Sequence, residues 1–255
     1  EIIEKNLFKN KYFKKINYKK KNDYLKNYDL IFNTDYNNSI TKKYFSKKIE
    51  KKYNSVAYTT ILKHQKISNN VAVQIFTKNG PLAFLPISDN ETSVVYSINN
   101  YVKEKEEIND LIKNYNFKYN IKKIDKIDCF ELKGLSLRSY YHKNILAFGD
   151  LIHRIHPLAG QGFNMTIRDI KTINEIIQNK KDLGLTLDKT LNEEFENSQK
   201  HRNYIFSSGI DFIHEFFNFE RKIKNDFLSK SIQLLNKNPN VNKLFTKIAD
   251  KGILF

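Results

Sequence analysis

The sequence predicts an α/β protein in which an antiparallel sheet is inserted into a domain of strands and helices, with further helices at the C-terminal end. Three observations predict this class. The apolar run 145–148 is typical of a buried strand, and after a glycine-containing loop the apolar residues return at helical spacing from Phe163 to Ile177. Four short runs between 53 and 98 are rich in β-branched and aromatic residues. Residues 182–255 carry helical patterns.

The composition favours a cytoplasmic protein with a hydrophobic core. A length of 255 residues suffices for one large domain or two small ones. The single cysteine, Cys129, excludes a disulfide framework and favours a reducing compartment. We expect this thiol to be a small buried hydrophobe rather than a nucleophile. No apolar run approaches the ~20 residues of a membrane span.

The formal net charge of +16 invites an interpretation as a nucleic-acid-binding protein, but the composition argues against it. Lysine far outnumbers arginine, and asparagine, isoleucine, tyrosine and phenylalanine are abundant throughout, which indicates a general compositional bias. A specific reader of bases would be expected to carry arginine in a defined motif. We therefore expect no nucleic-acid partner, although a basic surface would favour anionic lipid headgroups or anionic cofactors.

The N-terminal part is expected to contribute one strand and a loop. Residues 1–27 interleave lysine with tyrosine, phenylalanine and asparagine, which predicts a solvated strand and loop. Residues 28–32 form a short apolar run that predicts a strand. Asp35 follows this strand, within the loop 33–42.

From about Ser46 the pattern predicts an antiparallel meander. Turn residues at 79–81 and 89–91 separate the last three of its runs. Strands are expected at 53–62, 71–76, 82–87 and 92–98, followed by an amphipathic helix at 101–115 and a strand at 121–132.

The stretch 144–177 organises the rest of the chain. Its strand delivers the carboxylate of Asp150, and its loop delivers the N-terminus of a helix that we expect to begin at about Phe163. Unpaired N–H groups and the positive end of the helix dipole gather at such a terminus. Because Gly160 and Gly162 have no side chain, a flat ligand can approach the backbone closely. Such a site suits a ring that becomes anionic.

Two plainer interpretations of this stretch were weighed against a ligand loop. Glycine and proline between a strand and a helix often serve only as turn residues. Three-residue spacing would also align Asp150, His153 and His156 on one side of a helix as metal ligands. Pro157 and Gly160 indicate a loop instead, and no fourth ligand is evident, so we expect no metal site.

The C-terminal part is expected to consist of helices. A long helix is predicted over 191–219 with a break near Gly209, and a second helix over 221–235. A last helix is predicted over 241–250, after the break at Asn238-Pro239.

The central stretch resembles one known family. The elements that carry the resemblance are Gly149-Asp150, the run His156-Pro157-Leu158-Ala159-Gly160-Gln161-Gly162-Phe163-Asn164, and Arg168-Asp169. In this order they are similar to the second flavin-contacting motif of the aromatic-ring hydroxylases, the FAD monooxygenases of the para-hydroxybenzoate hydroxylase type. This version is most similar to the ubiquinone-biosynthesis (2-polyprenylphenol) hydroxylases.

Further similarities flank this motif in the order of the family. Asp35 and Ser39 match the family's Asp-Gly motif, although Asn33 and Tyr36 stand where glycines are usual and Lys42 replaces arginine. The substrate-domain sheet of the family is similar to the segments that contain Gln74, Phe76 and Phe84; its C-terminal region is similar to 202–203 and 248–252.

The resemblance implies a partial Rossmann-like FAD-binding domain with an inserted antiparallel substrate-binding sheet. FAD is the implied cofactor, NAD(P)H the electron donor, and O2 and a polyprenylated phenol the substrates. By the same resemblance, the aspartate binds the ribityl chain, and the helix start faces the pyrimidine edge of the flavin. The implied cofactor-binding residues are Asp35, Gly149, Asp150, Pro157, Leu158, Ala159, Gly160, Gln161, Gly162, Phe163 and Asn164, and the implied substrate residues are Gln74, Phe76 and Phe84. No catalytic acid–base side chain is implied.

The expected division of the chain follows from this assignment. Residues 1–45 and 136–180 are expected to form the FAD-binding domain, 46–135 the sheet domain and 181–255 a helical region. The family's Gly-x-Gly-x-x-Gly fingerprint for the ADP half of FAD is absent, because none of the eight glycines can form it. We therefore expect the chain to be the C-terminal two-thirds of a longer protein, or a decayed gene product, and to bind FAD weakly or not at all.

The expected function is hydroxylation of a polyprenylated phenol in ubiquinone biosynthesis. The enzyme is expected in the cytoplasm, with peripheral attachment to the inner membrane or to a ubiquinone-biosynthesis complex as a further possibility. The alternatives are a related flavoprotein with another aromatic substrate, a flavoprotein reductase of the same superfamily, and a non-catalytic fragment that holds no flavin.

Overall fold

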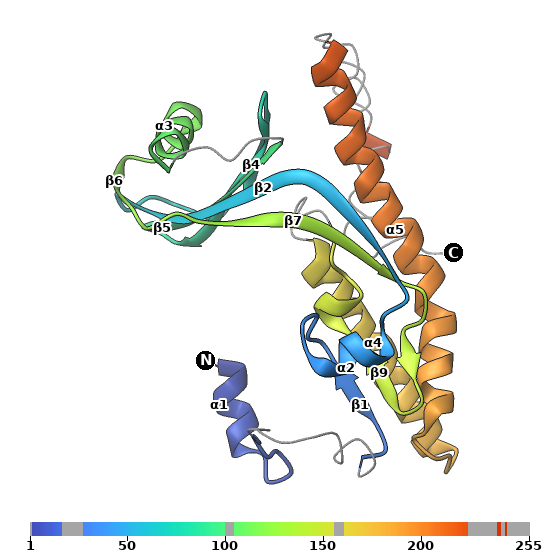
Figure 1. The fold of residues 1–255 in the computed structure, drawn as a ribbon. Helices are drawn as coiled ribbons and strands as arrows, with labels where there is room; N and C mark the ends of the chain where they lie inside the picture. The colour runs from blue at the N-terminus through green and yellow to red at the C-terminus, as the bar shows by residue number, and fades with distance from the viewer. Residues whose placement is uncertain are drawn as a thin grey trace.

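The computed structural model describes residues 2–16, 28–99, 105–155 and 161–223, together with Pro239, Asn240 and Lys243. The molecule has two parts, joined by the long strands β2 (Lys48–His64) and β7 (Asp128–Leu137), which run side by side from one part to the other (Figure 1). One part is an antiparallel sheet, and the other is a small sheet packed against two long helices.

The antiparallel sheet contains six strands. Its path follows β3 (Val73–Thr77), β4 (Gly80–Ser88), β5 (Glu91–Asn99), β2 and β6 (Ile121–Ile124), and β7 pairs with β2 away from this path. Every one of these pairs is antiparallel, so the predicted meander is confirmed. The single strand predicted at 121–132 is instead the two strands β6 and β7. Asp125 lies between them, where its backbone N–H donates to the Ile61 carbonyl.

Helix α3 (Lys105–Tyr115) covers one face of this sheet. Side chains alternate between the two faces of a strand, and the apolar residues of one face form a continuous core with Ile108 and Ile112 of the helix. This core contains Tyr58, Leu62, Leu82, Phe84, Val94, Tyr96 and Ile98. The predicted helix at 101–115 is confirmed from Lys105 onward, and residues 101–104 lie outside the described residues.

The small sheet brings together segments that are far apart in the sequence. Its order is β1 (Ile31–Asn33), β9 (Ile145–Ala147) and β8 (Tyr141–His142), with β1 parallel to β9 and β8 antiparallel to β9. The strand predicted at 28–32 is thus present at Ile31–Asn33, shorter and one residue further on at its end, and the strand predicted at 145–148 is present at Ile145–Ala147. A short helix, α2 (Ser39–Tyr44), follows β1, and a single 3-10 turn (Gly149–Leu151) follows β9.

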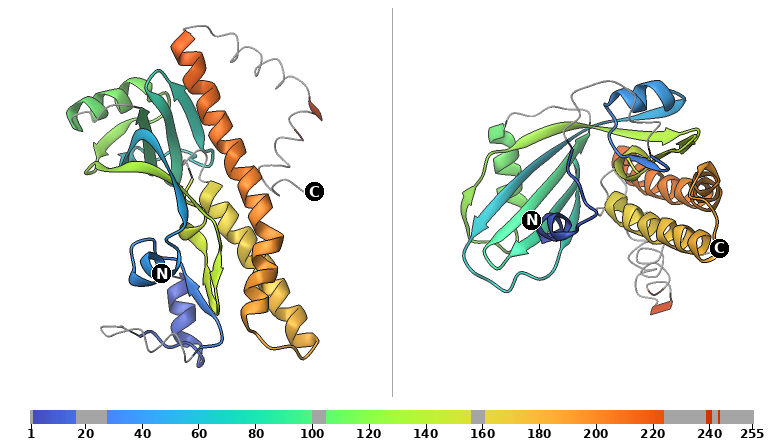
Figure 2. Two further views of the ribbon diagram at one scale, coloured as in Figure 1. Left: turned by 45° about the vertical axis from the view of Figure 1, so that its right-hand side comes forward. Right: turned by 90° about the horizontal axis from the view of Figure 1, so that it is seen from below.

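Two helices, α4 (Gln161–Asp182) and α5 (Lys189–Ile223), lie side by side against the small sheet (Figures 1 and 2). Apolar residues of β9 and the 3-10 turn pack with Ile173 and Ile176 of α4 and with Leu191 and Phe195 of α5, which forms a second core. Between the helices, Gln199 Nε2 donates to Thr172 Oγ1 at 3.1 Å. This core fixes the angle at which α4 meets the end of β9.

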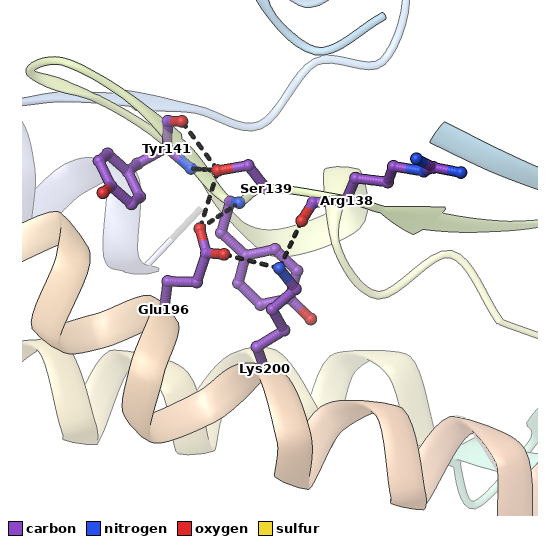
Figure 3. A network of polar contacts seen from close by, with 6 residues as sticks. Arg138, Ser139, Tyr141, Glu196 and Lys200 are labelled. Atoms are coloured by element: carbon purple, nitrogen blue, oxygen red, sulfur yellow. Dashed lines mark hydrogen bonds and ion pairs between the residues drawn. The ribbon is translucent and has the colours of Figure 1, made fainter. Parts of the chain in front are cut away.

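Helix α5 also holds the segment that leads into β9. Glu196 accepts hydrogen bonds from Ser139 Oγ at 2.9 Å and from the Tyr140 backbone N–H at 2.8 Å (Figure 3). The same carboxylate pairs with Lys200 at 2.7 Å, and Lys200 donates to the carbonyl of Arg138. Three consecutive residues before β8 are therefore bound to one turn of α5.

Several predictions about elements are wrong. The N-terminal segment contains an exposed helix, α1 (Ile2–Lys9), where a solvated strand and loop were predicted. Helix α5 continues through Gly209 without the predicted break, because glycine can adopt helical backbone angles as other residues do. Cys129 is exposed rather than buried; it lies near the start of β7, for which β2 is the one pairing partner among the described strands.

The mixed α/β class with an antiparallel sheet and C-terminal helices is confirmed. The helices predicted at 221–235 and 241–250 lie almost wholly outside the described residues. Residues 17–27, the second part of the predicted N-terminal strand and loop, lie outside them as well. Within the described ranges, none of the helices is both long and apolar enough to cross a membrane.

Candidate functional site

The candidate site begins at the carboxyl ends of the parallel strands β1 and β9. Asn33 is in register with Ala147, and the backbone N–H of Phe148 donates to the Asn33 carbonyl at 2.9 Å. The residues after both strands, Thr34 and Gly149, therefore emerge at the same edge of the sheet. In open α/β sheets, ligands bind in the crevice outside the carboxyl ends of the strands.

A hydrogen-bonded loop follows β1. Asn38 caps α2 by accepting from the Thr41 backbone N–H at 2.8 Å, and its amide donates to Asn33 Oδ1 at 2.6 Å. Asp35 is exposed, and its carboxylate accepts from the Asn37 backbone N–H at 2.7 Å. These contacts shape the loop after β1 and leave the Asp35 side chain at the surface.

Tyr36 stands where the resembling family has glycine, and the structure shows what it contacts. Its hydroxyl donates to Glu50 Oε1 at 2.6 Å, and the guanidinium of Arg154 lies 4.7 Å from the ring centroid. Lys48 also lies over this ring and bonds to Glu50 at 2.7 Å. The hydrogen bond from Lys48, with a second one from Tyr36, holds the pKa of Glu50 below its ordinary value. Tyr36 thus connects the loop after β1 to β2 and to the loop after β9.

Gly149 lies where three elements meet. It has a left-handed backbone, with φ of +60°, that a side chain would disfavour. A Cβ built there would lie 3.7 Å from the Thr34 methyl group after β1 and 3.8 Å from the Thr166 methyl group of α4. Asp150 comes next, in the 3-10 turn, and its side chain is exposed. The turn therefore presents a carboxylate beside the first turns of α4.

Helix α4 begins at Gln161, two residues earlier than predicted, so Gly162 lies inside its first turn. A Cβ at Gly162 would lie 3.0 Å from the carbonyl oxygen of His153, and the helix start thus packs closely on the loop after β9. The side chains of Phe163 and Asn164 are exposed. Four predicted site residues, Pro157, Leu158, Ala159 and Gly160, lie outside the described residues.

The buried face of α4 differs from the predicted apolar stripe. Phe163, Ile167 and Ile170 are exposed, although their spacing predicted burial. The residues that face inward are Met165, Asp169, Ile173, Ile176 and Lys180. The helix is thus rotated from the predicted orientation, and its inward face carries Asp169 among the apolar residues Met165, Ile173 and Ile176.

Asp169, which belongs to the motif Arg168-Asp169, is bonded to His153, which was considered above only as a metal ligand and rejected. His153 Nε2 lies 2.6 Å from Asp169 Oδ2, and both side chains are wholly or almost wholly inaccessible to solvent. Arg168 does not share this bond. Its guanidinium lies 4.6 Å from the Phe206 ring centroid, and burial lowers its pKa. The sequence signals for this pair were the spacing from Asp150 to His153 and the motif Arg168-Asp169. Neither indicates that His153 and Asp169 bond to each other, because apolar periodicity reports only which apolar residues are buried.

A cavity of about 430 Å³ lies behind the loop after β9, between it, β7 and α5. Ile152, Ile155, Tyr140 and Asn203 are among the residues that line it. Tyr140 is buried, and this burial raises the pKa of its hydroxyl although a hydrogen bond with Asn203 opposes the shift. The buried phenol therefore stays protonated throughout the physiological range.

The three predicted substrate residues of the sheet do not lie together. Val73 is in register with Phe84 and Gln74 with Ala83, so Phe84 faces the α3 side while Gln74 and Phe76 face the other side. Phe84 is wholly buried in the core, with ring contacts to Phe117 and Tyr119. Phe84 is thus placed as a core residue, and Phe76 lies on a face with other exposed apolar side chains.

No protein-family model matches the chain. By sequence, the chain is 27% identical over 152 residues to 3-demethoxyubiquinol 3-hydroxylase of Escherichia coli (strain K12), a match that covers 56% of this chain and 39% of the relative. It is 24% identical over 262 residues to ubiquinone biosynthesis monooxygenase COQ6, mitochondrial, of Drosophila melanogaster, covering 86% of this chain and 55% of the relative. The chain thus spans less than two thirds of the length of either relative.

Solved structures share the fold at low identity. Superposition on p-nitrophenol 4-monooxygenase PnpA from Pseudomonas putida DLL-E4 gives a TM-score of 0.58 at 13% identity and covers 87% of this chain and 56% of that chain. The OxyS anhydrotetracycline hydroxylase from Streptomyces rimosus also gives 0.58, at 12% identity, covering 87% and 46%. The chain is therefore related in sequence to the ubiquinone-biosynthesis hydroxylases and has the fold of the FAD-dependent monooxygenases, as its motifs predict.

Proposed function

We propose that the protein is an FAD- and NAD(P)H-dependent monooxygenase that hydroxylates the aromatic ring of a polyprenylated phenol in ubiquinone biosynthesis, with O2 as cosubstrate. One observation carries the proposal. Gly149, Asp150 and the first turn of α4 converge at the carboxyl edge of two parallel strands, in the order of the flavin motif. The names of the sequence relatives point to the same pathway.

The residues at this edge fit a flavin. The Asp150 carboxylate is exposed and suited to accept hydrogen bonds from the hydroxyls of a ribityl chain. Gln161 to Asn164 carry the first four backbone N–H groups of α4, which have no carbonyl partner within the described helix, and the helix dipole favours negative charge there. They would stabilise charge at the flavin N1–C2=O edge. FAD, when bound, supplies the redox chemistry that transfers an oxygen atom to the ring.

The open face of the antiparallel sheet fits an apolar substrate. The face opposite α3 carries Ile61, Phe76, Leu85 and Phe130, which are between 36% and 52% exposed. Exposed apolar surfaces of this kind often mark the binding site of an apolar ligand or partner. A prenylated ring would remove these side chains from solvent, and we assign the polyprenylated phenol to this face.

The proposal is tested by flavin titration of Asp150→Ala and Gly162→Ala. Asp150→Ala should weaken flavin binding by ~1–3 kcal/mol, because a charged acceptor is lost. Gly162→Ala should weaken it too, since the added methyl group crowds the His153 carbonyl at 3.0 Å and displaces the helix start. Riboflavin and FAD fluorescence quenching measure the affinity, and NAD(P)H oxidation measures turnover of any complex that forms.

The matched control is Gly209→Ala. Gly209 lies inside α5, and a Cβ there would meet nothing within 4 Å, so the fold and flavin affinity should be kept. Gly184 is a poorer control, because its φ of +66° would strain any side chain. Circular dichroism confirms that each variant is folded. If Asp150→Ala and Gly162→Ala bind flavin as the parent does, the flavin assignment of this edge is wrong.

A further inference from the structure

We propose that His153 and Asp169 form a positioning pair, which sets the turn that holds Asp150 against the first turns of α4. The inference rests on the proposed function in one respect: the two elements that the pair holds are the two that we assign to the flavin. It adds a role for residues that neither touch the flavin edge nor face solvent.

The bond between the two side chains is short and isolated. His153 Nε2 and Asp169 Oδ2 are 2.6 Å apart, within side chains that are 0% and 1% exposed. For the remaining polar atoms, His153 Nδ1 and Asp169 Oδ1, which are also buried, the described residues supply no hydrogen-bond partner. A buried carboxylate is costly unless it is paired. Within the described part of the chain, this one directed bond is therefore the hydrogen bond that compensates for burying both groups.

Asp169 is buried at the expense of apolar residues on the same helix. Ile167 and Ile170 flank it and are exposed, and burying either of them would be favourable on its own. The helix instead turns its carboxylate inward, toward the loop after β9. The inward face of α4 thus combines this carboxylate, bonded to His153, with the apolar residues Met165, Ile173 and Ile176.

The backbone of His153 connects this bond to the site. Its N–H donates to the Gly149 carbonyl at 3.0 Å, which closes the turn that contains Asp150. Its carbonyl oxygen packs on Gly162 in the first turn of α4, at 3.0 Å from the position of a Cβ. The Asp150 turn and the start of α4 therefore both rest on one residue, whose side chain is anchored at Asp169.

A hydrogen bond suits this task better than apolar packing. Apolar contacts are non-directional, whereas a charge-assisted hydrogen bond fixes both distance and angle. Ligand-binding groups need placement within about 0.5 Å, which is achieved by residues that are themselves locked. His153 and Asp169 act through Asp150 and the helix start, so they are positioning residues and not catalytic ones.

The first test needs no flavin. Hydrogen exchange of the purified 255-residue chain follows the amides of Leu151, Ile152 and His153, which are bonded to the Phe148 and Gly149 carbonyls. His153→Leu should accelerate their exchange at least about tenfold relative to Lys180→Met. Lys180 is the matched control: it is also polar and buried on α4, but it bonds to Thr190 at the other end of the helix. His153→Gln, which keeps a donor in reach of Asp169, should restore most of the protection.

The second test asks whether the pair acts through Asp150. His153→Leu should weaken riboflavin binding about tenfold or more, because a displaced turn misplaces its carboxylate. In an Asp150→Ala background the same substitution should cost less than about threefold, since contacts in one network are not additive. A general loss of stability would instead give the same factor in both backgrounds.

The outcomes separate the two proposals. Equal exchange of the 151–153 amides in His153→Leu and Lys180→Met would overturn the positioning pair. Additive losses in riboflavin affinity would overturn it as well. If the parent chain binds no riboflavin, that result agrees with the missing fingerprint for the ADP half of FAD, and the exchange experiment alone decides for or against the pair.

Discussion

The two parts of the molecule each bury a histidine, and the two histidines are treated differently. In the antiparallel sheet, His64 uses both ring nitrogens: Nδ1 bonds to the Gln65 carbonyl at 2.8 Å and Nε2 to Thr92 Oγ1 at 3.0 Å. Beside the small sheet, His153 uses one ring nitrogen, on Asp169, and the other finds no partner in the described part of the chain.

The same contrast extends to the surrounding groups. Around His64, Asn69 donates to Thr92 Oγ1 and to the carbonyls of Ser88 and Glu91, and it accepts from Tyr119. Among the described residues, all but one of the buried side-chain atoms that lack a partner belong instead to the loop after β9, α4 and α5. Native proteins satisfy most buried polar groups, and exceptions concentrate at functional sites. The sheet is thus satisfied as a structural unit, while the part with α4 keeps polar groups that packing alone does not explain.

The largest expected effect tests the structural character of the sheet. Gly80→Ala should destabilise the chain by at least about 3 kcal/mol, because φ is +144° and a Cβ would lie 1.9 Å from the Ser97 carbonyl oxygen. Gly149→Ala should cost only about 1–2 kcal/mol, since its φ of +60° is strained but the nearest atom is 3.7 Å away. Urea unfolding followed by circular dichroism compares the two. A smaller loss for Gly80→Ala than for Gly149→Ala would contradict the tight β3–β4 turn.

The next effect compares the two histidines directly. His153→Leu should cost about 3–5 kcal/mol, because it leaves the Asp169 carboxylate buried without compensation. His64→Leu should cost about 1–3 kcal/mol, since the partners it leaves are neutral.

A double variant sharpens this comparison. Leucine at both 153 and 169 should recover part of the loss of His153→Leu, because two apolar groups need no compensation. Unfolding free energies of the four proteins measure the difference. If the two substitutions are additive, the double variant is less stable than His153→Leu by the whole amount that Asp169→Leu costs alone. That result would contradict the distinction between the two parts.

What the sequence reveals differs between these parts for a physical reason. The strands of the sheet were predicted because alternation along a strand and turn residues between strands are local signals. The buried face of α4 was predicted wrongly. The apolar pattern placed Phe163, Ile167 and Ile170 inward, and such a pattern does not count a carboxylate as an inward residue. Only the three-dimensional structure shows that Asp169 has a partner sixteen residues earlier in the sequence.

The site was predicted from motif order rather than from packing. Gly149, Asp150 and Gly162 lie at one edge because β1 and β9 are parallel neighbours, which no local pattern states. Phe84 was named with Gln74 and Phe76 as a substrate residue, yet the register of β3 and β4 separates them onto two faces. Sequence proximity to a motif therefore grouped these residues by segment, but could not assign their side chains to faces of the sheet.

The smallest expected effect compares an exposed carboxylate in each part by its pH dependence. Asp188 caps α5: its carboxylate accepts from the backbone N–H of Thr190 at 2.9 Å. The hydrogen bonds from the Thr190 side chain and backbone lower the pKa of Asp188 below its ordinary 3.8. In the sheet, the pKa of Glu131 is lowered by its hydrogen bond with the exposed Lys133 side chain. A fixed amide should hold a carboxylate more effectively than a flexible lysine, whose ordering opposes the pairing.

The sign follows from the direction of the shift. A carboxyl group whose folded-state pKa is lowered stabilises the folded chain above its unfolded pKa, and this stability is lost as the pH falls through the folded-state pKa. Asp188→Ala should therefore lower the melting temperature at neutral pH, and its curve should approach that of the parent below pH 3.8. Glu131→Ala should follow the parent throughout, since exposed ion pairs contribute little. Thermal melts between about pH 3 and 7 measure both. Parallel curves for Asp188→Ala and the parent at every pH would show that the cap acts through its hydrogen-bonding shape and not through its charge.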